Sequence, residues 1–80
     1  MKKATIKAAN GLHARPAAEF VKLASECTGD VQLKKGDKAV SAKSIMRLMS
    51  LGIVQGDEVY VITEDEALAD RLASFLDQME

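Results

Sequence analysis

At 80 residues the chain has room for one domain, which we take to span residues 1–80. Charged residues make up 29% and hydrophobic residues 48% of it, a balance that is typical of globular proteins and excludes a disordered chain. No apolar run approaches the roughly 20 residues that cross a bilayer, and the basic start lacks an apolar signal-peptide core, so we expect a cytoplasmic protein without membrane insertion.

The net charge is only −1, but it is unevenly distributed. Residues 1–56 carry ten basic and four acidic groups (+6), whereas residues 57–80 carry one basic and eight acidic groups (−7). The first part therefore predicts a basic face for an acidic partner. Nucleic acid is not expected, because no aromatic residues are interleaved with the basic ones. The single cysteine, Cys27, predicts neither a disulfide nor a metal site.

The first half of the chain predicts a strand and then a helix. Residues 3–9 alternate around an isoleucine and indicate a strand, which Asn10-Gly11 ends. Pro16 marks a helix start, since its missing N–H is not needed in the first turn. Residues 17–27 have apolar side chains at helical spacing, and Thr28-Gly29-Asp30 ends this helix.

The middle of the chain predicts a hairpin and a short helix. Residues 31–34 and 38–40 indicate two strands, joined by a tight turn at Lys35-Gly36-Asp37. Residues 41–50 indicate a short helix, with Ser44 as its N-cap.

The last third of the chain predicts a strand and the clearest helix. Residues 58–62 are rich in β-formers. Thr63 and Glu66 have the spacing of a capping box at a helix start. One apolar stripe follows, formed by Leu68, Leu72, Phe75, Leu76 and Met79. The order β-α-β-β-α-β-α favours an α+β two-layer sandwich, with helices on one face of a mostly antiparallel sheet.

The only histidine, His13, lies between a predicted strand and a predicted helix, so we expect an exposed ring. Neutral imidazole is a covalent nucleophile. A transferred phosphoryl group needs positioning and charge stabilisation, which the helix N-terminus and the Arg15 guanidinium could supply. Gly11 would let the turn approach the site. By themselves these residues leave a structural interpretation open, in which His13 ends a strand and Arg15 is a solvated charge.

Two segments resemble one protein family. Residues 11–18, Gly-Leu-His-Ala-Arg-Pro-Ala-Ala, closely resemble the active-centre motif of HPr, the histidine-containing phosphocarrier of the bacterial sugar phosphotransferase system. Residues 43–53 are similar to that family's regulatory serine segment, in the same order and at nearly the same spacing. The resemblance implies a four-stranded antiparallel sheet covered on one face by three helices.

The resemblance also implies a role for each site residue. His13 matches the phosphorylated histidine, usually modified on Nδ1, and Arg15 matches the arginine that assists transfer. Enzyme I would phosphorylate His13, with phosphoenolpyruvate as the original donor, and enzyme IIA domains would receive the group. The chain would then be a stoichiometric carrier rather than an enzyme, would need no cofactor and would act as a monomer.

Ser44 has two compatible interpretations. As an N-cap, its hydroxyl accepts from an early helical N–H. As a regulatory phosphosite, it would gain negative charge at a helix N-terminus, near Lys43 and Arg47, and this charge would oppose docking of an acidic partner. The second interpretation rests on similarity to the Gram-positive form of HPr, which implies a kinase/phosphorylase and a catabolite control protein as partners.

The short helix carries more apolar residues than one buried stripe requires. We expect Leu48 and Leu51 to face the core, and the other apolar residues to help in partner docking, because exposed methionines suit a surface with several partners. The predicted docking residues are Ala14, Ala18, Lys22, Ile45, Met46, Arg47 and Met49.

Two alternatives remain open. A nitrogen-type or regulatory paralogue is one, although the regulatory kind typically lacks the active histidine, so His13 counts against it. A small ligand-binding α/β sandwich is the other, but it would need a Gly-rich ligand loop that the sequence does not contain.

Overall fold

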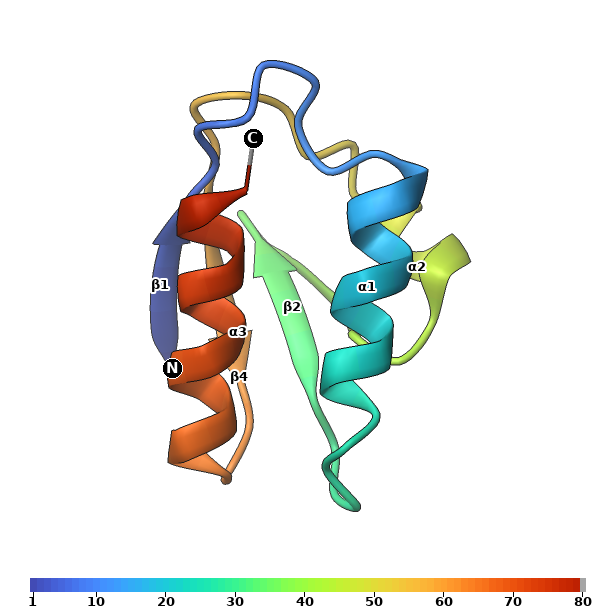
Figure 1. The fold of residues 1–80 in the computed structure, drawn as a ribbon, viewed down its shortest axis with the longest axis vertical. Helices are drawn as coiled ribbons and strands as arrows, with labels where there is room; N and C mark the ends of the chain where they lie inside the picture. The colour runs from blue at the N-terminus through green and yellow to red at the C-terminus, as the bar shows by residue number, and fades with distance from the viewer. Residues whose placement is uncertain (80) are drawn as a thin grey trace.

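The chain forms one four-stranded sheet with three helices, which a computed structural model describes for residues 1–79 (Figure 1). All strand pairs are antiparallel, and the order across the sheet is β1-β4-β2-β3. The elements are β1 (Lys2–Thr5), α1 (Ala14–Ala24), β2 (Gln32–Lys35), β3 (Lys38–Ser41), α2 (Ile45–Ser50), β4 (Glu58–Ile62) and α3 (Glu66–Gln78). The predicted element order is confirmed.

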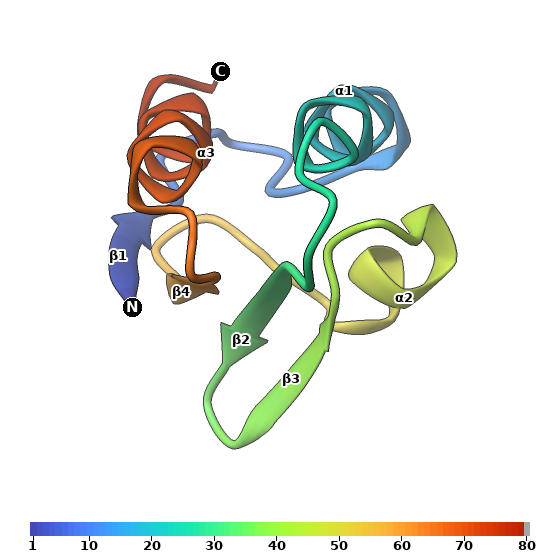
Figure 2. The same ribbon diagram turned by 90° about the horizontal axis from the view of Figure 1, so that it is seen from below.

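The helices form one layer and the sheet forms the other. Seen from below, α1 and α3 lie side by side over the same face of the sheet, and α2 packs beside α1 and β3 (Figure 2). This arrangement confirms the predicted α+β open-faced sandwich. None of the helices in residues 1–79 has the length and apolar character to cross a membrane.

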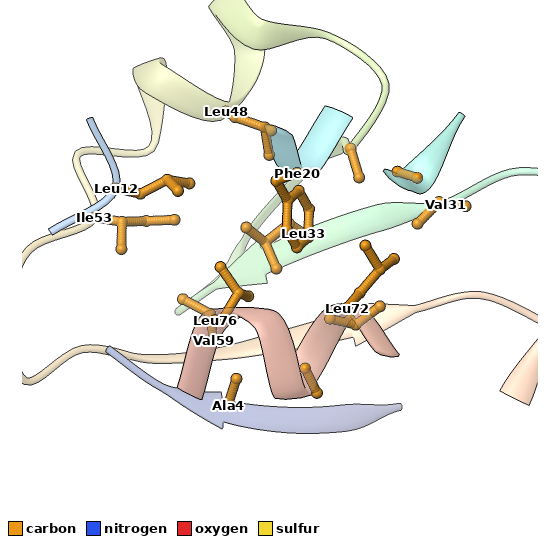
Figure 3. Close-up of a cluster of buried hydrophobic side chains, with 14 of the residues drawn as sticks. Ala4, Leu12, Phe20, Val31, Leu33, Leu48, Ile53, Val59, Leu72 and Leu76 are labelled. Carbon is orange, nitrogen blue, oxygen red and sulfur yellow. The ribbon is translucent and has the colours of Figure 1, made fainter. Parts of the chain in front are cut away.

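The core between the two layers is aliphatic around one aromatic ring. Phe20 of α1 is fully buried, as are Leu33, Leu48 and Leu72 from the sheet and the other two helices (Figure 3). The Phe20 ring lies 6.0 Å from that of Phe75 on α3, in a tilted arrangement. Burial of one such side chain stabilises the fold by about 1.5–3 kcal/mol. The core therefore fixes α1 relative to α3 and to the sheet.

Helix α1 is displaced from the predicted one. It spans Ala14–Ala24, whereas the sequence predicted a start at Pro16 and an end at Cys27. A proline is tolerated at this third helical position because the first N–H groups of any helix have no intrahelical acceptor. At the other end, the N–H groups of Glu26 and Cys27 bond to carbonyls three residues back, which is the geometry of tight turns.

Strand β1 is shorter than predicted. It ends at Thr5 rather than near Ala9, because its partner β4 begins at Glu58, directly opposite Thr5. Beyond this point Ile6 still bonds to a loop, through its N–H to the Asp57 carbonyl (2.9 Å). The alternation of buried and exposed residues therefore continues without a strand.

The predicted capping box before α3 is wrong. The N-cap is Asp65, whose carboxylate accepts from the Leu68 N–H (3.0 Å). The Thr63 hydroxyl instead accepts from the Asp65 N–H (3.3 Å). Asp65 takes the role because aspartate is as strong an N-cap as threonine or stronger, and the helix starts two residues later than the Thr63 box requires.

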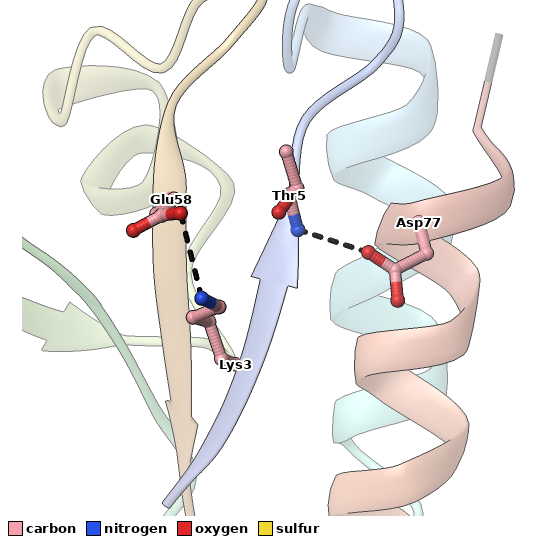
Figure 4. A network of polar contacts seen from close by, with 4 residues as sticks. All are labelled: Lys3, Thr5, Glu58 and Asp77. Atoms are coloured by element: carbon pink, nitrogen blue, oxygen red, sulfur yellow. Dashed lines mark hydrogen bonds and ion pairs between the residues drawn. The ribbon is translucent and has the colours of Figure 1, made fainter.

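Figure 4 shows two of the side-chain contacts that hold β1 in place. Lys3 Nζ lies 3.4 Å from Glu58 Oε2 on β4. The Thr5 N–H donates to Asp77 Oδ1 near the end of α3 (2.9 Å). The second contact fixes the last turn of α3 against the start of the loop that leads to His13.

Candidate functional site

His13 is the N-cap of α1 and uses only its backbone for that role. Its φ and ψ of −98° and −177° are extended, and its carbonyl accepts from the Ala17 N–H (3.0 Å). The side chain forms no capping hydrogen bond and is exposed, as expected. Within the described residues 1–79, the fold therefore places the imidazole at a helix N-terminus without using its ring nitrogens.

The first turn of α1 supplies groups that suit an anion. The N–H groups of Ala14 and Arg15 precede the first intrahelical bond, so no acceptor within the helix competes for them. Within residues 1–79, the Arg15 guanidinium has neither a hydrogen bond nor an ion pair, and the residue is exposed. Together with the helix dipole, these groups favour negative charge beside His13.

An open hollow of about 510 Å³ lies at His13. One wall is the first turns of α1 and the other is the last turn of α3. Its lining residues are His13, Arg15, Pro16, Glu19, Phe75, Gln78 and Met79. A larger hollow of about 840 Å³ lies between the end of α1 and the start of α3, at the opposite end of both helices, and contains none of the predicted site residues.

The loop that carries His13 is bound to the loop before β4, and the two run side by side at the top of Figure 1. The Leu12 N–H donates to the Ile53 carbonyl (3.2 Å), and the Gly56 N–H donates to the Ile6 carbonyl (2.7 Å). Gly11 has a φ of +63°, and a Cβ on it would overlap the Ile53 carbonyl oxygen, so the two backbones are in close contact here. The position of His13 thus depends on a segment about 40 residues away in the chain.

The second loop is itself tied to the sheet by an ion pair that sequence reasoning missed. Lys35 Nζ of β2 lies 2.8 Å from Asp57 Oδ2 and donates to the Gly52 carbonyl (2.7 Å). The same Asp57 oxygen accepts from the Val54 N–H (2.8 Å). The hydrogen bond from Lys35, followed by that from Val54, lowers the pKa of Asp57 from its ordinary value. Nothing in the sequence pattern pairs these residues.

This ion pair predicts a pH-dependent stability. Because folding lowers the pKa of Asp57, its contribution is present above the unfolded-state value near 3.8 and is lost as pH falls through the folded-state value. We expect Asp57→Asn to lower the free energy of unfolding by about 1 kcal/mol near neutral pH, and by much less at about pH 3. Urea denaturation at both pH values measures this. The exposed Asp30→Asn is the control, and an equal loss at both pH values for Asp57→Asn would contradict the assignment.

Ser44 is the N-cap of α2, as predicted. It is half-buried, and its hydroxyl accepts from the Arg47 N–H (3.3 Å). The expected proximity of the Lys43 ammonium needs correction: Lys43 Nζ donates to the carbonyls of Cys27 (2.6 Å) and Gly29 (2.8 Å), in the segment that follows α1. Lys43 therefore ties the residues before α2 to the segment after α1 rather than facing Ser44.

The predicted docking residues are all exposed. Met46 is 83% exposed, Ile45 41% and Met49 40%, whereas Leu48 and Leu51 are buried as predicted. On α1 and α2 the exposed polar or small residues of the set are Ala14, Ala18, Lys22 and Arg47. Because α1 and α2 pack together, these positions belong to adjacent helices.

One apolar residue of this region was missed. Val54, in the loop against Gly11, is 57% exposed. A valine between two glycines, Gly52 and Gly56, carries no sequence signal for a surface role, so only its place beside the His13 loop draws attention to it.

Comparison with known proteins decides the family. The model described as the PTS HPr component phosphorylation site matches residues 1–80. The chain belongs to the HPr family. It is therefore an HPr-type phosphocarrier protein of the phosphotransferase system or an HPr-like regulator.

Individual relatives cover almost the whole HPr fold. The phosphocarrier protein HPr of Borreliella burgdorferi is 38% identical over 99% of this chain and 95% of its own. The HPr-like protein Crh of Bacillus subtilis is 46% identical over 95% of this chain and 93% of its own. The crystal structure of Bacillus anthracis HPr matches with a TM-score of 0.84 and 37% identity, over 94% of this chain and 93% of that one. The similarity thus extends to both carriers and regulators.

Proposed function

We propose that the chain accepts a phosphoryl group from phosphorylated enzyme I on Nδ1 of His13 and passes it to enzyme IIA domains. The observation that carries this is an exposed imidazole at a helix N-terminus next to Arg15, where neither side chain bonds to another of residues 1–79. Those two residues have the chemistry that the transfer needs, and a structural histidine would instead have its ring nitrogens bonded.

The transfer needs no acid or base from this chain. The lone pair of neutral Nδ1 attacks phosphorus, and the N–P bond forms as the bond between phosphorus and the donor atom breaks with its electron pair leaving on the donor. The proton stays on Nε2, so the product is a phosphorylated imidazolium. In this proposal the Arg15 guanidinium and the N–H groups of Ala14 and Arg15, in the first turn of α1, stabilise the phosphoryl oxygens during transfer.

We assign docking of enzyme I and enzyme IIA to the exposed residues of α1 and α2 around His13. Met46, Ile45 and Met49 offer exposed apolar side chains, and Arg15, Lys22 and Arg47 add positive charge on the same two helices. Such a surface suits acidic partners of different shapes. These partners imply a cytoplasmic carrier. Action as a monomer stays a prediction, since Crh of Bacillus subtilis and HPr of Thermoanaerobacter tengcongensis have both been solved as dimers.

The proposal is tested by incubation with enzyme I and phosphoenolpyruvate. We expect one phosphate per chain, labile in acid and stable in base, as for an N–P bond. Addition of an enzyme IIA domain should then discharge it. A chain that gains no acid-labile phosphate would contradict the carrier function.

The second candidate is a regulator similar to Crh, which the 46% identity to that protein favours. A regulator would bind its partner without phosphorylation at His13. The incubation with enzyme I separates the two functions, because only a carrier becomes phosphorylated at His13.

We also propose Ser44 as a regulatory phosphosite of an ATP-dependent kinase, with a catabolite control protein as the partner of the phosphorylated form. Ser44→Ala should lose all acid-stable phosphate formed with such a kinase. It should also lower the free energy of unfolding by about 1 kcal/mol, since the N-cap bond to Arg47 disappears. Phosphate analysis and urea denaturation measure these. Ser50→Ala, at the other end of α2, is the control. Acid-stable phosphate that persists in Ser44→Ala would point to another residue.

A further inference from the structure

We propose that Glu19 is a tuning residue that raises the free energy of phosphorylated His13 and so makes the chain a better phosphoryl donor. The inference rests on the proposed function. Glu19 lines the same hollow as His13 and Arg15, and it is exposed. It is also the only carboxylate among the described lining residues, since these otherwise comprise His13, Arg15, Pro16, Phe75, Gln78 and Met79.

The position of Glu19 on α1 allows it to act on Arg15. The two residues are four apart, so they occupy successive turns of one helix face, where side chains of this length meet. Within residues 1–79, Arg15 and Glu19 form no ion pair. At this spacing on a helix, a pair in which the basic residue precedes the acidic one is weaker than a pair in the reverse order. Glu19 therefore competes for the guanidinium without sequestering it.

Phosphorylation of His13 changes the electrostatic interactions in this hollow. It places a phosphoryl dianion on a ring that becomes an imidazolium, so the net charge at His13 falls by about one unit. A carboxylate in the same hollow repels this charge and draws on the same guanidinium, and both effects favour departure of the group. In water-exposed surroundings such a repulsion shifts an equilibrium by about threefold. The magnitude suits a carrier, which must both accept and donate.

The test is the equilibrium constant for phosphoryl transfer between enzyme I and this chain, measured from the phosphorylated fractions of both proteins. We expect Glu19→Gln to shift it by about threefold toward phosphorylated His13, and Glu19→Lys to shift it further. Glu19→Asp should leave it nearly unchanged. Both shifts should shrink at about 1 M salt, where charges are screened within roughly 3 Å. This constant compares free species, so it is independent of how tightly the partners dock.

The matched control is Glu64→Gln, which makes the same charge change at the opposite end of the molecule, where Glu64 lines the other hollow. It should leave the constant unchanged. Equal constants for wild type and Glu19→Gln, or equal shifts for Glu64→Gln and Glu19→Gln, would overturn the inference while the carrier function stands. A wild-type chain that takes no acid-labile phosphate would overturn both.

Discussion

His13→Ala is expected to abolish acid-labile phosphorylation by enzyme I and phosphoenolpyruvate, a loss of at least about 100-fold, because no other side chain of this chain supplies an imidazole. Stability should change by no more than about 0.5 kcal/mol, since the ring is exposed and forms no capping bond. Radiolabelled phosphate incorporation and urea denaturation measure the two effects.

Arg15→Ala and Arg15→Lys serve as graded controls for the His13 result. The alanine variant should still be phosphorylated, but about 10- to 100-fold more slowly, because the guanidinium stabilises charge rather than forming the covalent bond. The lysine variant should recover part of the rate, as it keeps the charge without the planar fork.

Undiminished phosphorylation of His13→Ala would show that the site lies elsewhere.

Gly11→Ala is expected to lower the free energy of unfolding by about 2–4 kcal/mol and to slow phosphorylation of His13. The first cause is a φ of +63°, which costs an L residue about 1–2 kcal/mol. The second is space: a Cβ at Gly11 would overlap the Ile53 carbonyl oxygen and would lie 2.8 Å from Val54 Cα. Since both contacts are backbone, relief requires the His13 loop to separate from the loop before β4.

Gly52→Ala separates these two causes. Gly52 has the same φ of +63°, but a Cβ there would meet nothing within 4 Å. We expect it to cost only the backbone strain, about 1–2 kcal/mol, and to leave the rate at His13 unchanged. Equal stability losses in the two variants would show that the contact between the loops is not what makes Gly11 necessary.

The residues that sequence reasoning placed well are those with local causes. Ser44 was predicted as an N-cap because its hydroxyl acts three residues away, and the bond to the Arg47 N–H is present. Leu48 was assigned to the core from helical spacing, which needs no partner to be known. His13 was expected to be exposed for the similar reason that it lies at a junction of two elements.

The features that sequence reasoning predicted wrongly are those that depend on distant parts of the chain. β1 ends at Thr5 because its partner β4 begins at Glu58, and the sequence of β1 does not show where its partner begins. Thr63 and Asp65 are both residue types that cap helices, so the N-cap could be identified only once the start of α3 was known. The Lys43 ammonium was expected near Ser44 from its adjacency in the chain, but it bonds to carbonyls at the end of α1.

The element order, the core stripes and the local group of Gly11, His13, Arg15 and Pro16 can be predicted from the sequence, because periodicity and turn chemistry act over a few residues. What surrounds this group becomes visible only in the folded molecule. The clamp between the two loops, the Lys35–Asp57 pair beneath it and the hollow between α1 and α3 all join residues that are distant in the chain. Contacts of this kind depend on packing, which is set by the whole fold rather than by any one segment.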